Sequence, residues 1–239
     1  MLSKFFTYLW DTAYQGNKNN IISLLEHNPK AKFLDLGCAE GTWTTECAKK
    51  MGTEQVYGVE VVDEQISLAQ SKGIIVEKGD LNKLIPFENN AFDVIHANQV
   101  IEHLYDTEKF MLEINRLCNV GGYIVLSTEN ASSWHNIFAL VLGWQMFSLT
   151  NVCSYGSVGN PLAIHRGDTG TSWKSMEHIR IFAYRGLIEY IEHFGFKVES
   201  ILCSGYYPLP NWFAKIDPRH GHFITIKARK TKPISLIMS

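Results

Sequence analysis

The chain has 239 residues, of which 46% are hydrophobic and 19% are charged, and its formal net charge at pH 7 is −2. This size and composition are typical of one globular domain with a sizeable core. Because the charge is nearly balanced and no basic run occurs, a nucleic-acid-binding surface is not expected.

Strand patterns and helix patterns alternate along the first half of the chain. After an N-terminal helical segment over residues 1–29, apolar runs predict strands, at 31–37, 55–61, 74–80, 91–100 and 123–130. The segments between them predict helices, at 42–52, 63–73 and 106–122, with Gly52 as a helix stop and Asp63 as an N-cap. Strands without polar alternation, joined by helices, predict a parallel sheet that is buried on both faces.

The rest of the chain departs from this alternation. Residues 131–182 interrupt it, and we expect them to form an inserted cap. Residues 184–196 predict a helix, and 197–207 and 220–230 predict two strands joined by a proline-containing loop. Two strands without a helix between them predict an antiparallel pair at the sheet edge. The predicted fold is therefore a single α/β domain over 1–239: a Rossmann-like, seven-stranded, mostly parallel sheet with an antiparallel edge strand, helices on both faces and an inserted cap.

Residues 132–147 are apolar nearly all round and predict a buried helix inside the insert. A lid over an apolar acceptor and a surface that contacts membrane lipid are the alternatives. The longest apolar run, residues 134–149, is shorter than the roughly 20 residues of a transmembrane helix, so we expect no stable insertion into a membrane. Asp11 interrupts the apolar N-terminus, which argues against a signal peptide. The five scattered cysteines form no C-x-x-C pair, which favours a reduced, cytoplasmic protein.

A glycine turn that carries acids follows the first predicted strand, with the sequence GCAEG over 37–41. A dinucleotide fingerprint would need glycine at positions 39 and 42, a P-loop would need Gly-Lys-Ser/Thr, and neither occurs. Asp35 and Glu40 would repel a pyrophosphate but would attract a cation. A ligand with a sulfonium or amine, a ribose and a carboxylate fits this turn, and S-adenosylmethionine has all of these groups.

The stretch FLDLGCAEG resembles the first motif of class I S-adenosylmethionine-dependent methyltransferases. Four later segments resemble the following motifs in order, namely VYGVEVVDEQ, EKGDL, FDVIHANQVIEHL and RLCNVGGYIVLSTEN. The resemblance is to the small-molecule subgroup that includes ubiquinone-biosynthesis methyltransferases. It implies that Glu60 holds the ribose hydroxyls, that Asp80 accepts from the adenine amino group, and that the Leu81 amide meets the ring. The residues that it places at the cofactor are Asp35, Gly37, Cys38, Ala39, Gly41, Trp43, Glu60, Val61, Gly79, Asp80, Leu81, Ala97, Asn98, Gln99 and His103.

The chemistry that this resemblance implies needs few catalytic groups. Methyl transfer is an in-line displacement on a sulfonium methyl group, so alignment and exclusion of water supply most of the catalysis. A base is needed only if the acceptor loses a proton, as a hydroxyl does. We expect His103 first and His178 second to be this base, with His135 and His165 as other histidines of the same region.

The acceptor is expected to be a small molecule. The insert is rich in aromatic, hydroxyl and imidazole side chains, which suit a sugar or a ring, so O-methylation is the expected reaction. His220 and His222 share one face of a predicted strand but have no evident acidic partner, so no metal site is predicted. We expect a monomer or dimer. Two alternatives remain open: a protein that binds the cofactor without catalysis, and a nicotinamide-dependent oxidoreductase on a similar sheet.

Overall fold

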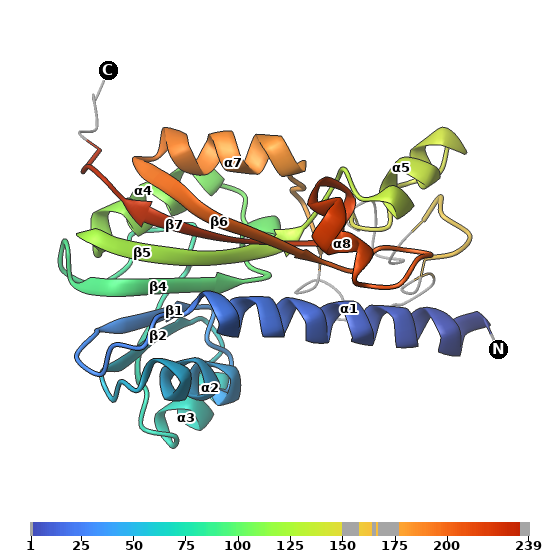
Figure 1. Cartoon of the computed structure of the whole chain (residues 1–239). Helices are drawn as coiled ribbons and strands as arrows, with labels where there is room; N and C mark the ends of the chain where they lie inside the picture. Colours follow the sequence, from blue (N-terminus) through green and yellow to red (C-terminus); the bar gives the residue numbers. More distant parts are fainter. Residues whose placement is uncertain (1, 150–157, 164–165, 167–176, 235–239) are drawn as a thin grey trace.

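The computed structural model describes residues 2–149, 158–163, 166 and 177–234, and its centre is a seven-stranded sheet (Figure 1). The strand order is β3-β2-β1-β4-β5-β7-β6. Each neighbouring pair from β3 to β5 is parallel, whereas β7 runs antiparallel to both β5 and β6. The predicted fold class is confirmed, and the antiparallel strand β7 lies inside the sheet while β6 forms its edge. The strands are β1 (Phe33–Leu36), β2 (Val56–Glu60), β3 (Ile75–Lys78), β4 (Phe92–Asn98), β5 (Cys118–Glu129), β6 (Phe196–Ser204) and β7 (Phe223–Lys230).

Helices cover both faces of the sheet, and each face has its own hydrophobic cluster. One cluster packs α1, α2 and α3 against Phe33 and Val94, and the other packs α4 and α7 against Leu34 and Ile95. Because successive strand residues point to opposite faces, Asp35 shares the face of Phe33 and meets the start of α2. The helices are α1 (Leu2–Leu24), α2 (Thr42–Met51), α3 (Asp63–Gln70), α4 (Thr107–Leu117), α5 (Trp134–Val141), α7 (Tyr184–His193) and α8 (Phe213–Ile216), with 3-10 turns η1 (Ile101–His103) and η2 (Pro218–His220).

Several predicted boundaries were wrong. Helix α4 ends at Leu117, and residues 118–122 belong to β5, because the chain pairs Cys118 with Phe92 of β4. Asp63 lies in the first turn of α3 and is not its N-cap, which is Val62. The proline-containing segment predicted as a loop holds α8 and η2.

Helix α5 is not the buried helix that its apolar sequence predicted. Its buried residues are Asn136 and Ala139, whereas Phe138 is 54% exposed and Val141 is 77% exposed. The Asn136 amide donates to the Asn130 carbonyl and to Ser148 Oγ, both at 2.9 Å. Because these partners lie on the inner side of α5, the helix turns its face with Asn136 inward. The apolar side chains therefore face outward. The end of the molecule that carries α5 also carries α8 and the N-terminal end of α1 (Figure 1).

The two ends of the predicted insert meet beside the sheet. Asn130 forms an isolated parallel bridge with Phe182, and the Ala131 N–H donates to the Phe182 carbonyl at 2.9 Å. Much of the predicted cap, at 150–157, 164–165 and 167–176, lies outside the described residues. Within the part of the chain that the structure describes, no helix is both long enough and apolar enough to cross a bilayer.

Candidate functional site

The turn between β1 and α2 holds three residues in the left-handed region. The φ angles are 78° at Gly37, 44° at Ala39 and 81° at Gly41. A Cβ on Gly41 would come within 2.5 Å of Ile74 Cδ1, so this position requires glycine for space as well as for conformation. The Gly37 N–H donates to the Val59 carbonyl at 2.9 Å and ties the turn to β2. The turn is thus a fixed backbone surface at the carboxyl end of the sheet, where open α/β folds bind ligands.

Asp35 lies beneath this turn, and both of its carboxylate oxygens have partners. Thr44 Oγ1 donates to Oδ2 at 2.5 Å, and His96 Nδ1 lies 2.7 Å from Oδ1. Both members of the Asp35–His96 pair are buried, at 3% and 1% exposure. His96 Nε2 has no hydrogen-bond partner among the described residues and its ring lines the pocket above. His96 was not predicted as a site residue, because a histidine within an apolar strand run cannot be told from a core residue by sequence.

A pocket opens at the carboxyl ends of β1 and β4, and it gathers some of the predicted site. The predicted residues that line it are Asp35, Gly37, Cys38, Ala39, Trp43 and Asn98. Glu40, which was named as an acid of the turn that attracts a cation, also lines it, and the residues that were not predicted are Tyr14, Lys18, Thr42, Glu46 and His96. The predicted residues outside its lining are Gly41, Glu60, Val61, Gly79, Asp80, Leu81, Ala97, Gln99 and His103. Burial raises the pKa of the Cys38 thiol to about 12, which fits a packing residue of the turn.

Helix α1 supplies one wall of this pocket. Tyr14 and Lys18 lie one helical turn apart, and the Lys18 ammonium lies 4.8 Å from the centroid of the Trp43 ring. Among the pocket-lining residues that the structure describes, Lys18 is the only lysine or arginine beside three acids. The pocket therefore offers a single cationic point within an acidic surrounding.

Asn17 fastens α1 to the sheet from a fully buried position. Its amide group donates to Asn98 Oδ1 at 2.9 Å, and its oxygen accepts from Ser127 Oγ and Thr225 Oγ1, both at 2.7 Å. These partners belong to β4, β5 and β7. One side chain thus fixes the helix that carries Tyr14 and Lys18, and no local sequence signal predicts it.

Glu60 ends β2 and braces the glycine turn. Its Oε2 accepts from the Ala39 N–H at 3.1 Å, while Oε1 accepts from the N–H groups of Val61 and Val62 at 2.7 and 3.0 Å. A carboxylate has about four acceptor sites, so one site remains for a ligand. The acid predicted for the ribose therefore also has a structural task.

The end of β3 lies next to Glu60. The Gly79 N–H donates to the Glu60 carbonyl at 3.0 Å, and Asp80 Oδ1 accepts from the Asn82 backbone and side-chain nitrogens. These bonds, led by the Asn82 backbone N–H, lower the pKa of Asp80. Leu81 follows, half-buried beside the core. Glu60 and residues 79–81 thus form a second group of polar atoms on the far side of the turn.

The chain after β4 has an unusual conformation. Ala97 is buried, Asn98 faces the pocket, and Gln99 has a φ of 56°. A left-handed, non-glycine residue costs conformational energy and is frequent at functional sites. It turns the chain into η1, which brings His103 to the same edge of the sheet as the pocket.

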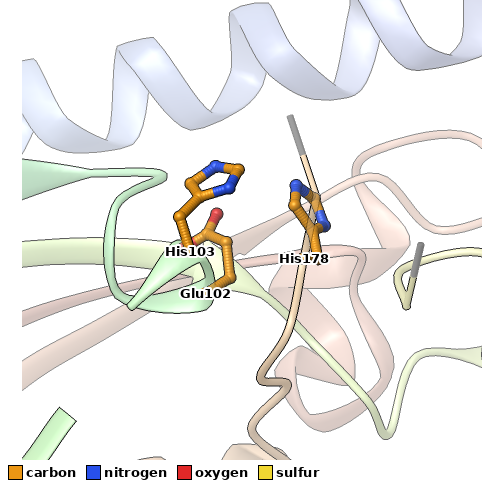
Figure 2. Close-up of side chains that lie close together, drawn as sticks. All are labelled: Glu102, His103 and His178. Carbon is orange, nitrogen blue, oxygen red and sulfur yellow. The ribbon is translucent and has the colours of Figure 1, made fainter. Parts of the chain in front are cut away.

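The structure brings His103 and His178 together, and Glu102, which precedes His103 in η1, lies beside them (Figure 2). The ring centroids of the two histidines are 4.8 Å apart. His103 Nδ1 lies 2.9 Å from the Glu177 carbonyl and His178 Nδ1 lies 3.0 Å from the Ser148 carbonyl. Burial and the charge of His178 lower the pKa of His103, while burial raises the pKa of Glu102 to about 7. Both histidines were predicted from the sequence, whereas Glu102 was not.

The other histidines considered earlier have different surroundings. His135 is packed among aromatic rings, with the His222 ring 4.5 Å away, and burial lowers its pKa well below the usual value. His220 belongs to η2, so the prediction that it shares a strand face with His222 is wrong. His220 also has an acidic partner, because its Nδ1 lies 2.6 Å from Asp217 Oδ2. An acidic partner also lies near His222, since Glu129 Oε2 is 3.5 Å from its Nε2. His165 lies outside the described residues.

Comparison with known proteins assigns the chain to a family. The family described as "Methyltransferase domain" matches residues 10–201. The chain belongs to this methyltransferase family. The membership of the class I S-adenosylmethionine-dependent methyltransferases that its motifs predicted is thereby confirmed.

The chain is similar to two curated proteins and to one solved structure. It is 30% identical over 105 residues to an uncharacterized methyltransferase of Schizosaccharomyces pombe, a match over 39% of this chain and 38% of that protein. It is 24% identical over 191 residues to the human mitochondrial ubiquinone biosynthesis O-methyltransferase, over 76% of this chain and 46% of that protein. The match thus spans less than half the length of either relative. An S-adenosylmethionine-dependent methyltransferase from Mesorhizobium loti shares the fold, with a TM-score of 0.60, 17% identity, and coverage of 89% of this chain and 96% of that one.

Proposed function

We propose that this protein transfers the methyl group of S-adenosylmethionine to a hydroxyl group of a small molecule, a sugar or a ring. The observation that carries the proposal is the acidic pocket above the glycine turn, with Lys18 as its only described cationic side chain. A sulfonium ion is favoured by the acids around it, and the amino acid carboxylate of the cofactor can pair with one lysine. A nicotinamide dinucleotide would place its pyrophosphate against Glu40 and Asp35, so an oxidoreductase is disfavoured.

The residues on either side of the turn fit the two ends of the cofactor. We assign the methionine end to the pocket between α1 and Trp43, where the Lys18 ammonium lies against the indole ring. We assign the ribose to the remaining acceptor capacity of Glu60, and the adenine to Asp80 with the Leu81 amide. The Gly79–Glu60 backbone bond, at 3.0 Å, holds these two acids in register.

The methyl acceptor is assigned to the side of the sheet where His103 and His178 lie. In the reaction, the acceptor oxygen forms a bond to the methyl carbon while the bond from that carbon to sulfur breaks, and the sulfonium becomes a neutral thioether. The acceptor hydroxyl gives up its proton to a base, and His103 or His178 has an imidazole suited to that task. The insert over 131–182 is proposed to form the acceptor region, and the human relative is itself named as an O-methyltransferase.

The proposal is tested by turnover. The purified chain is incubated with S-adenosylmethionine and a panel of phenols, sugars and amines, and S-adenosylhomocysteine is quantified by mass spectrometry. We expect product with hydroxyl acceptors, and we expect His103→Gln or His178→Gln to lower turnover by about 10²–10⁴-fold, the usual contribution of a general base. Product from amines alone would contradict O-methylation, and cofactor binding without turnover of any acceptor would favour a non-catalytic protein.

A further inference from the structure

His96 of β4 lines the pocket at the glycine turn and lies next to Asp35. The two residues are register partners in the parallel pair of β1 and β4, so their side chains lie on the same face of the sheet. The His96 side chain is 1% exposed, and its Nε2 has no hydrogen-bond partner among the described residues. A buried polar atom in this state is costly unless a ligand compensates it.

The Asp35 carboxylate itself is closed to a ligand. It is 3% exposed, Thr44 Oγ1 donates to its Oδ2, and His96 Nδ1 lies 2.7 Å from its Oδ1. A carboxylate only accepts, so His96 Nδ1 donates its proton and the lone pair of the neutral ring is at Nε2. The charge of Asp35 makes this lone pair more basic, as a carboxylate does behind a metal-bound histidine. Asp35 therefore acts on the pocket through His96, which presents an acceptor for a cationic N–H group.

Trp43 supplies a donor to the same pocket from the first turn of α2. Its Nε1 is buried and has no hydrogen-bond partner within the described part of the chain, and an indole N–H only donates. The Lys18 ammonium lies 4.8 Å from the centroid of the Trp43 ring and adds a positive charge on this side. The pocket thus has a donor with a cation on one side and an acceptor backed by a carboxylate on the other.

We propose that His96 Nε2 accepts a hydrogen bond from the α-ammonium group of the cofactor, and that Trp43 Nε1 donates one to its α-carboxylate. The two unpartnered nitrogens differ in polarity as the two groups of an amino-acid zwitterion do. Both groups are attached to one carbon atom of the ligand. The ring centroids of His96 and Trp43 are 6.5 Å apart, which leaves room for that carbon and for two hydrogen bonds of about 2.9 Å.

The consequence for the reaction rests on the proposed function. Two bonds to the α-carbon substituents fix the side chain that carries the sulfonium, and so they align the methyl group with the acceptor. Asp35 is then a positioning residue, because it orients the imidazole that binds the ligand. A nucleoside that lacks the free α-amino acid loses both bonds, so the pocket selects for ligands that carry it.

The ammonium contact is tested with His96→Asn. The asparagine amide nitrogen takes the place of Nδ1 and still donates to Asp35, whereas no atom replaces Nε2. We expect S-adenosylhomocysteine to bind about 10- to 100-fold more weakly, the range for a hydrogen bond to a charged group. Binding of 5′-methylthioadenosine, which lacks the amino-acid end, should not change. Calorimetry with both ligands measures the difference.

The carboxylate contact is tested with Trp43→Phe, which keeps an aromatic ring beside Lys18 and removes the N–H group. It should weaken S-adenosylhomocysteine by about tenfold or more. It should leave unchanged the binding of decarboxylated S-adenosylhomocysteine, which keeps only the ammonium group, whereas His96→Asn should weaken that ligand too. Trp43→Phe with the affinity of the parent chain, or with equal losses for the two ligands, overturns the carboxylate assignment.

Thr44→Val is the matched control for His96. Thr44 is the other partner of Asp35 and is fully buried, but it is not one of the described residues that line the pocket. This variant should lower the melting temperature and keep the affinity for S-adenosylhomocysteine. The His96 assignment is overturned if His96→Asn weakens S-adenosylhomocysteine no more than Thr44→Val does, or weakens 5′-methylthioadenosine by the same factor. Failure of S-adenosylhomocysteine to bind the parent chain overturns the proposed function instead.

Discussion

At the residue scale, the Glu60 carboxylate braces the glycine turn, and we propose that it also holds the ribose of the cofactor. It accepts from three backbone N–H groups around the turn and keeps one acceptor site for a ligand. We predict that Glu60→Ala weakens S-adenosylhomocysteine binding by about 1.5–3 kcal/mol, the range for hydrogen bonds to a charged group. Calorimetry measures this loss.

Glu60→Gln is the control for the structural task, because its amide oxygen can still accept from the turn. It should keep the melting temperature of the parent chain more closely than Glu60→Ala does. If Glu60→Ala lowers the melting temperature but leaves affinity intact, the carboxylate braces the turn and does not hold the ribose.

The buried Asp35–His96 pair is a second residue-scale feature with a stability consequence. Removing one partner of a buried, hydrogen-bonded pair leaves the other without compensation, at a cost of about 3–5 kcal/mol. We therefore predict that Asp35→Ala lowers the free energy of unfolding by about this amount, measured by urea denaturation. Glu46→Ala, an exposed residue of the same pocket, should change it by less than about 0.5 kcal/mol. Equal effects of the two variants would show that Asp35 is not a structural acid.

At the scale of elements, the docking of α1 decides whether the pocket has its outer wall. Asn17 is the only described residue of α1 that bonds to side chains of three strands. We predict that Asn17→Ala leaves buried polar groups unpaired and destabilises the chain by about 1–3 kcal/mol. It should also speed hydrogen exchange in α1 and weaken cofactor binding, because Tyr14 and Lys18 lie on this helix.

Asn19→Ala is the matched control, since Asn19 is exposed on the same helix and, among the described residues, its side chain bonds only to that of Gln15. It should leave both exchange and affinity unchanged. Unaltered exchange in the Asn17 variant would mean that apolar packing alone holds α1 to the sheet.

The elements also show what a sequence can and cannot predict. Strands β1, β2 and β4 were predictable because burial on both faces requires a run of apolar residues. The acidic residues in or next to these runs are easy to recognise because their neighbours are apolar. Helix α5 was predicted as buried because an apolar composition does not say which face turns inward, and Asn136 decides that through partners elsewhere in the chain. The pocket residues from α1 were missed for the same reason: which face of α1 meets the sheet depends on Ser127 and Thr225, more than 100 positions away.

At the scale of the whole molecule, the five motifs predicted a cofactor site at the carboxyl ends of the first strands, but they did not predict the residues that other parts of the chain bring to it. The order of strands follows from the parallel α/β pattern, and it brings the ends of β1, β2 and β4 together. Glu102 was overlooked because it sits in an apolar-flanked turn, and its burial and its approach to His178 appear only once the insert returns to the sheet. The chemistry of the acceptor side therefore depends on long-range packing that periodicity does not encode.

The last prediction concerns the stability of the whole molecule. A ligand that binds only the folded state stabilises it by about 2.7 kcal/mol at a concentration of 100 times its dissociation constant. For a chain of this size, 1 kcal/mol corresponds to about 2–4 °C in melting temperature, so we predict that S-adenosylhomocysteine raises it by about 5–10 °C. NAD at the same concentration should give no shift, because its pyrophosphate meets Asp35 and Glu40 at the turn. The comparison is made by differential scanning fluorimetry on the parent chain and on Glu60→Ala, in which the shift should shrink. A larger shift with NAD than with S-adenosylhomocysteine would mean that the acids do not set the ligand's charge, and the assignment of the pocket to a sulfonium cofactor would fail.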